Sequence, residues 1–429
     1  MKSRNSSFCV GTMLVGVAIF CVALAATAFG QGRPAIGDAA SGGVAPNDPS
    51  PAADSYRKGA EALEKGDVDA ALAHFNRAIE LDPKHANSYC DRGLALVMKG
   101  DIDKGIGDLD MAIKLAPDGP RSFFNRGFAH FRKGEFDKAV TDYTEAIRLE
   151  PKYADAYRDR GYNRVMLGEA DQALGDLDTA IRLAPKDAAG YTSRGKAFFE
   201  LGEWDRAIAD YTRATELDPQ SPDNWCERGH ARVMKGDCDA AFLDLDQAVK
   251  LAPKDPTYRF VRAFAYRKKG DWDKALTDLA EVAGAQPDFA EVYRERGFVL
   301  AQKGDLDRGL ADLDEAVKRL PQDYEARLCR GDVYLLKGDQ ERASADYDAA
   351  LKLDPNFAEG HFHRAMLRLA RNEAGPALDD YRDLIRVEPR TPDAYKDWGR
   401  PEDRARRSQA VDRLEDALQA VKAEAMSHS

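Results

Sequence analysis

The chain has few of the features that mark enzymes, disulfide-rich proteins or nucleic-acid-binding proteins. Six cysteines in 429 residues are too few for a disulfide framework. No GxxxxGK(S/T) phosphate-binding loop is present, and the seven histidines are scattered. The 63 basic and 74 acidic residues give a net charge of −11, without a basic stripe. Because such a chain matches phosphate backbones poorly, we expect no nucleic-acid binding.

The first 30 residues have the pattern of a secretory signal peptide. Lys2 and Arg4 precede an uncharged apolar stretch, residues 10–28, that ends in small residues suited to cleavage. We expect residues 1–30 to be removed on export, which makes the protein periplasmic, secreted or envelope-associated. An uncleaved membrane anchor is the alternative, because the stretch is just long enough to span a bilayer. Residues 31–51 are rich in Gly, Pro, Ala and Ser and are expected to form a flexible linker.

From residue 52 the sequence repeats every 34 residues, ten times, without insertion or deletion. Ten prolines mark the interval: Pro83, Pro117, Pro151, Pro185, Pro219, Pro253, Pro287, Pro321, Pro355 and Pro389. When repeat 1 is residues 52–85, positions 8 and 20 of each repeat are Gly or Ala, which lets two helices approach closely. Position 15 is Gly in repeats 1–9 and Asn372 in repeat 10, so a positive φ is expected to end the first helix there. Acidic residues that follow, such as Asp101 and Asp103, favour the start of a second helix.

This pattern resembles the tetratricopeptide repeat family. An aromatic residue precedes x2-Arg-Gly, then come Gly-Asp/Glu-x-Asp-x-Ala and an aromatic residue or Leu before x2-Ala-Ile and Pro. The resemblance covers residues 52–391 and implies an all-α, right-handed superhelical solenoid of helix-turn-helix repeats. First helices would line an inner groove, and second helices would form the outer face. Residues 392–429 are expected to be a degenerate eleventh repeat and a capping helix, with Val411, Leu414, Leu418 and Val421 covering the last repeat.

Position 7 departs from the family, because arginine stands where leucine is usual. An aspartate follows each of these arginines by 16 residues, and repeat 1 lacks both. Positions 7 and 23 are equidistant from the turn, so we expect a structural ion pair within each of nine repeats; a ligand-binding arginine ladder is the alternative. The pairs are Arg92–Asp108, Arg126–Asp142, Arg160–Asp176, Arg194–Asp210, Arg228–Asp244, Arg262–Asp278, Arg296–Asp312, Arg330–Asp346 and Arg364–Asp380.

The predicted partner-binding groove contains positions that face inward in the family. Its aromatic residues are Tyr56, Phe124, Phe128, Phe131, Tyr162, Phe199, Phe260, Phe264, Phe298 and Phe362. We expect about half of these rings to be core and the rest to form an exposed apolar strip, the kind of surface that marks interaction sites. Position 6 of even repeats adds the acidic residues Asp91, Asp159, Glu227 and Glu295, which either steer a basic partner or are simply solvated. Arg158 and Arg294 stand beside two of them, and neutralisation of those two is a further alternative.

No constellation of catalytic residues is recognisable, so we predict a non-catalytic protein with no cofactor and no metal. The leading hypothesis is an exported scaffold or adaptor that holds an extended polypeptide segment, apolar or basic, in the groove. The alternatives are a structural spacer of the cell envelope and an accessory subunit of an envelope enzyme or secretion complex. Contact with a membrane is expected only if the N-terminal segment stays uncleaved. The oligomeric state and the identity of the partner are left open by the sequence.

Overall fold

A computed structural model describes residues 50–388, 408–409, 411–417 and 419. Helices are the only regular structure in these residues. No helix within them is both long and apolar enough to span a membrane. The predicted signal peptide and linker lie outside the described residues, apart from the last two linker positions.

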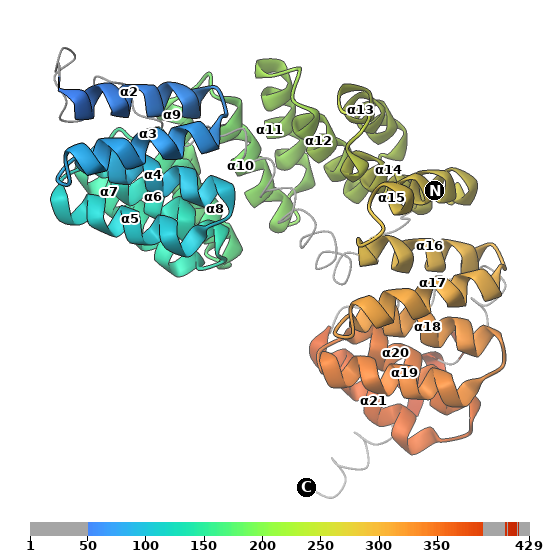
Figure 1. Cartoon of the computed structure of the whole chain (residues 1–429). Helices are drawn as coiled ribbons and strands as arrows, with labels where there is room; N and C mark the ends of the chain where they lie inside the picture. The colour runs from blue at the N-terminus through green and yellow to red at the C-terminus, as the bar shows by residue number, and fades with distance from the viewer. Residues whose placement is uncertain (1–49, 389–407, 410, 418, 420–429) are drawn as a thin grey trace, which may run out of the picture. The chain divides into compact units, whose positions relative to one another are not determined.

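Each of the ten repeats consists of two helices, and in nine repeats the two helices pack side by side (Figure 1). The first helices are α2 (Pro51–Glu64), α4 (Ala86–Lys99), α6 (Pro120–Arg132), α8 (Ala154–Met166), α10 (Ala188–Glu200), α12 (Pro222–Lys235), α14 (Pro256–Lys269), α16 (Ala290–Gln302), α18 (Tyr324–Leu336) and α20 (Ala358–Ala370). The second helices are α3 (Val68–Leu81), α5 (Ile102–Leu115), α7 (Phe136–Leu149), α9 (Ala170–Leu183), α11 (Trp204–Leu217), α13 (Cys238–Leu251), α15 (Trp272–Ala285), α17 (Leu306–Arg319), α19 (Gln340–Leu353) and α21 (Ala374–Val387).

The described residues form two compact units. The first unit ends at Lys235 and contains α2 to α12; the second begins at Gly236 and contains α13 to α21. Within each unit every helix packs on the next one along the chain. The order of contacts is therefore the order of the sequence, as in repeat proteins whose repeats touch only their neighbours.

The turn inside each repeat confirms the prediction for position 15. All nine glycines there have positive φ, from 71° at Gly202 to 101° at Gly100, and Asn372 has φ 63°. The acidic N-caps behave less uniformly. The side chains of Asp67 and Asp237 accept a backbone hydrogen bond, whereas that of Asp101 accepts none.

Close approach of the paired helices explains the small residues at position 8. A Cβ atom on Gly93 would lie 2.8 Å from the carbonyl oxygen of Gly105 on the facing helix. In repeats 3, 5 and 9 the space beside the position 8 glycine is filled by a tyrosine ring at position 24, as at Tyr143 and Tyr211. In repeats 2, 4 and 8 a leucine fills it instead.

The C-terminal segment covers the last repeat, as predicted. Val411 and Leu414 are buried, and they share a hydrophobic cluster with Phe362, Tyr381 and Leu384 of α20 and α21. The Tyr381 hydroxyl also donates a hydrogen bond to Glu415, at 3.2 Å. Two other predicted members of this cap, Leu418 and Val421, lie outside the residues whose side chains are described.

Candidate functional site

Eight of the nine predicted arginine–aspartate ion pairs lie within one unit, and all eight form. In seven of these pairs, the arginine Nε and Nη2 atoms donate to different oxygens of one aspartate carboxylate. In the eighth pair, the Nε and Nη2 atoms of Arg364 both donate to Oδ1 of Asp380. The two residues of the remaining pair, Arg228 and Asp244, belong to different units. Two-point contact of this kind fixes the relative position of two helices. These pairs therefore belong to the frame, by which we mean the residues that hold the two helices of a repeat together.

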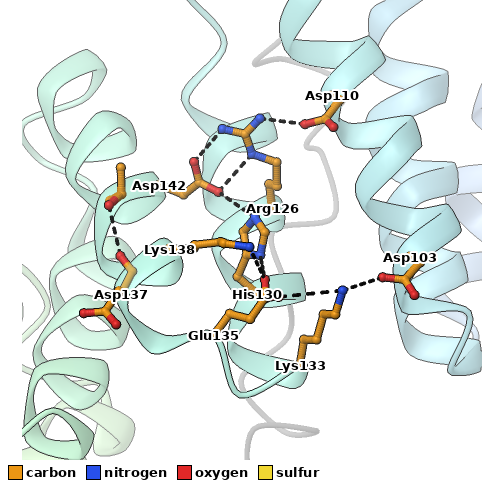
Figure 2. A network of polar contacts seen from close by, with 10 residues as sticks. Asp103, Asp110, Arg126, His130, Lys133, Glu135, Asp137, Lys138 and Asp142 are labelled. Carbon is orange, nitrogen blue, oxygen red and sulfur yellow. Dashed lines mark hydrogen bonds and ion pairs between the residues drawn. The ribbon is translucent and has the colours of Figure 1, made fainter.

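A further contact of the same arginines was missed in the sequence. The Nη1 atom of Arg126 donates a hydrogen bond at 2.7 Å to Asp110 of the preceding repeat, as Figure 2 shows. The same bond joins Arg194 to Asp178 and Arg330 to Asp314. Each acceptor stands 16 residues before its arginine, the mirror image of the spacing to its partner within the repeat. Each of these arginines thus links two successive second helices.

The expectation of an exposed aromatic strip is wrong. Nine of the ten predicted rings are buried, from Phe362 at 1 % exposed to Phe131 at 7 %, and only Phe298 is half-buried. The buried rings are Tyr56, Phe124, Phe128, Phe131, Tyr162, Phe199, Phe260, Phe264 and Phe362. Aromatic residues of the following repeat cover some of them. Phe131 meets the Tyr162 ring edge-on at 6.0 Å, and Phe199 lies 4.7 Å from the His230 ring.

The acidic residues of position 6 are also buried, which contradicts the interpretation that they are solvated. Asp91, Asp159, Glu227 and Glu295 are all less than 8 % exposed. Each lies near a basic residue: Asp91 near Arg121, Asp159 near Arg158, Glu227 near Lys196, and Glu295 near Arg267 and Arg294. The charge that would steer a basic partner is therefore balanced from within the protein.

Asp91 and Asp159 show how differently these pairs are built. Asp91 accepts a hydrogen bond from the Tyr56 hydroxyl at 2.9 Å, and Arg121 of repeat 3 lies 3.3 Å away. Burial raises the pKa of Asp91, although Arg121 opposes that effect. Asp159 instead pairs with its neighbour Arg158 at 2.8 Å, and burial raises the pKa of Asp159 to about 6.

In the second unit, Arg294 is the centre of a larger network. Its Nη1 atom lies 2.8 Å from Asp323 and 2.9 Å from Glu325, and its Nε atom lies 3.6 Å from Glu295. The pKa of Glu325 is raised to about 7, and burial is the largest cause of this rise. Arg294 acts in the opposite direction and lowers the pKa. On the other side of Glu295, Arg267 lies 3.3 Å away and contacts the faces of Phe264 and Phe298.

The contacts between repeats were missed in the sequence, because the residues that form them stand about one repeat length apart. Tyr56 and Asp91 are 35 residues apart, as are Cys90 and Asn125, whereas Lys196 and Glu227 are 31 apart. Polar residues separated by one repeat length plus or minus a few residues were the signal in the sequence that could have revealed these contacts. From repeat 2 on, the exposed residues of the first helices lie at positions 13 and 14 and include Met98, Glu200 and Leu336.

The residues that could hold a metal or react as nucleophiles do not gather into a site in the described part of the chain. No group of three His, Cys, Asp or Glu residues there has metal-binding geometry. Cys90, Cys226, Cys238 and Cys329 form no disulfide within the described residues, and the first two are buried.

Comparisons with known proteins agree with this architecture of repeated helix pairs. Models described as TPR repeat or tetratricopeptide repeat match residues 59–100, 120–153, 195–236, 226–290, 260–323 and 331–370. No curated protein matches the chain. Among solved structures, a tetratricopeptide repeat protein from Parabacteroides merdae is similar over 58 % of this chain and 98 % of its own, with 19 % identity and a TM-score of 0.50.

Two further solved structures are similar over most of their own length. Yeast Tom70 matches over 88 % of this chain and 99 % of its own, with 15 % identity and a TM-score of 0.48. A TPR protein from Thermus thermophilus matches over 43 % and 100 %, with 24 % identity and a TM-score of 0.39. Proteins with this repeat are in general non-catalytic modules for interaction with other proteins. The family models together match more than half of the 429 residues, and the chain belongs to the tetratricopeptide repeat family.

Proposed function

We propose that the protein is an exported, non-catalytic scaffold that holds an extended polypeptide segment on the face formed by positions 2, 5, 6, 9 and 13 of its first helices. This surface is called the first-helix face below. The observation that carries the proposal is the set of buried charged pairs on it. Each pair has a different arrangement, whereas the arginine–aspartate pairs of the frame repeat almost unchanged.

Buried charged pairs are a poor way to stabilise a stack of helices. Removing two charges from water costs several kcal/mol, and well-packed apolar residues of similar size often do as well or better. The aromatic and apolar residues at position 5 of other repeats, such as Phe124 and Leu328, show that this frame accepts apolar residues there. Retaining Arg158 and Arg294 at the same position indicates that the pattern of charge serves recognition.

The buried rings act as support for this surface. Phe128, Tyr162 and Phe264 hold the first helices against each other and leave the outer ends of position 13 side chains in contact with solvent. Met98 is 37 % exposed and Leu336 41 % exposed, so they offer apolar contacts at the border of the charged pairs. A bound segment would therefore contact the exposed residues at position 13, among them Met98, Glu200 and Leu336, and the buried charged pairs beneath would fix the arrangement of the first helices that carry them.

The binding experiment compares two double variants of the mature chain. Pull-down from envelope extracts, followed by mass spectrometry, identifies the partner, and its affinity is then measured with purified proteins. Met98→Asp with Glu200→Lys alters the first-helix face and should weaken binding at least about tenfold. The control is Met111→Asp with Glu216→Lys, which makes the same changes at exposed residues of second helices. Equal affinity of both variants and the parent would contradict the proposal.

Export is the other part of the proposal, and it rests on the charged start, apolar stretch and small residues of the first 30 positions. N-terminal sequencing of the protein from its native host should give a chain that begins near Gln31. A sequence that still begins with Met1 would favour the membrane anchor.

A structural spacer of the envelope would behave differently in solution. It would self-associate through its terminal repeats, and sedimentation would show chains or rings whose size increases with concentration. The scaffold predicts a constant oligomeric state in the absence of its partner.

A further inference from the structure

A second series of ion pairs runs along the turn edge of the repeats. A lysine at position 14, at the end of a first helix, contacts the aspartate at position 18 of the preceding repeat, at the start of a second helix. The pairs are Lys99–Asp69 at 2.6 Å, Lys133–Asp103 at 2.7 Å, Lys235–Asp205 at 2.5 Å and Lys269–Asp239 at 2.5 Å, with Lys303–Asp273 and Lys337–Asp307 arranged alike. The aspartates are at least 80 % exposed in all six.

This series is interrupted at two consecutive places in the first unit. Position 14 of repeats 4 and 5 is leucine, at Leu167 and Leu201. Asp137 and Asp171, which stand where the other repeats have the acidic member of the pair, are exposed, and within residues 50–388 their carboxylates form no ion pair. Figure 2 shows the difference: Asp103 meets Lys133, while the Asp137 carboxylate has no contact with the residues drawn.

The leucines that interrupt the series are accessible to solvent. Leu201 is 43 % exposed and Leu167 is half-buried. Trp204, half-buried in the following helix, packs edge-on against Phe199 at 4.9 Å. Lysine would leave less apolar surface in water at position 14, as it does in six other repeats, so fold stability does not account for leucine here.

We propose that Asp137, Asp171, Leu167 and Leu201 form a docking surface for a lysine-bearing segment of a partner protein. The six complete pairs show what each aspartate accepts in this setting, which is an ammonium group from a neighbouring position 14. At the two interrupted places the partner supplies that ammonium group, and its lysine stem packs against the exposed leucine. This surface is separate from the first-helix face, so the inference goes beyond the proposed function.

The probe for the test is a short synthetic peptide in which lysine alternates with leucine, labelled for fluorescence anisotropy. Binding to the mature chain should decrease steeply with added salt, because the acidic residues are exposed. The same peptide with acetylated lysines should not bind. Leu167→Lys with Leu201→Lys fills both places from within and should weaken binding at least about tenfold.

Two controls separate this site from general attraction between opposite charges. Leu81→Lys with Leu243→Lys adds the same charge at exposed leucines elsewhere and should leave the affinity unchanged. Asp137→Asn with Asp171→Asn should weaken binding about tenfold, whereas Asp69→Asn with Asp103→Asn, at aspartates that already have a lysine, should not.

Three results would overturn the inference. The first is no binding of the lysine peptide at about 1 mM, and the second is an equal loss in the control variants. The third is a concentration-dependent dimer that Leu167→Lys with Leu201→Lys abolishes, because the surface would then belong to a contact between two copies of this chain. None of these results depends on the first-helix face, so the proposed function is tested separately.

Discussion

Arg194 joins three helices through one guanidinium group. Its Nε and Nη2 atoms donate hydrogen bonds to Asp210 of the same repeat at 2.8 and 2.7 Å, and Nη1 donates to Asp178 of the preceding repeat at 2.7 Å. The Asp210 side chain is 9 % exposed and that of Asp178 is 64 % exposed. The two acceptors therefore contribute to stability under very different degrees of solvent screening.

Asp210→Ala should lower the free energy of unfolding by about 2–4 kcal/mol, because it leaves the Arg194 charge partly buried without its main partner. Arg194→Leu added to this variant should recover part of the loss. Asp178→Ala, the matched control, should cost only about 0–1 kcal/mol. Thermal and urea unfolding measure all three, and an Asp210→Ala variant as stable as the parent would show that the pair is not part of the frame.

Two glycines of repeat 2 should respond oppositely to the same substitution. Gly93→Ala places a methyl group 2.8 Å from the Gly105 carbonyl and should destabilise the protein by about 1–3 kcal/mol. The methyl group added by Gly107→Ala lies on an exposed face of α5 and has no atom within 4 Å. This substitution should stabilise the protein by about 0.5–1 kcal/mol. Equal effects on the melting temperature would mean that helices α4 and α5 do not approach as closely as described.

Stability should depend on pH through Glu325, whose pKa is raised to about 7 from 4.5, mainly by burial. Arg294 opposes this rise, while Asp323, Glu295 and Glu359 add to it. Because the folded protein binds the proton more tightly than the unfolded chain, the contribution of Glu325 is fully present below pH 4.5 and is lost as the pH rises through about 7.

The free energy of unfolding of the parent should therefore fall between about pH 5 and pH 8 relative to that of Glu325→Gln, by an amount on the order of 1–3 kcal/mol. Urea unfolding at several pH values measures the difference. Glu341→Gln, at an exposed glutamate of the same repeat, is the control and should parallel the parent. If Glu325→Gln also parallels the parent, the carboxyl group does not titrate in this range.

Sequence reasoning predicted the frame well because its physics lies within one repeat. The turn at Gly100, the contact of Gly93 with the facing helix and the pairing of Arg194 with Asp210 each depend on residues that share a helix-turn-helix unit. Periodicity amplifies such signals, since the same requirement appears ten times.

The surface was predicted less well, since burial there is decided between repeats. Phe131 and Asp91 have inward-facing positions, but Tyr162 and Arg121 of the next repeat lie against them, and no property of a single repeat shows that. The lysine–aspartate series was missed for the same reason. Lys133 and Asp103 are 30 residues apart, a spacing that acquires meaning only when two repeats are stacked.

The most direct test of the first-helix face uses two methionines that are matched in type and exposure. Met98 on α4 and Met111 on α5 are each 37 % exposed, one on a first helix and one on a second. A photoreactive phenylalanine analogue replaces either residue in the full-length chain, and the protein is cross-linked in its native host. We expect a discrete cross-linked partner from position 98 and none from position 111. The same partner from position 111 alone, or equally from both, would contradict it.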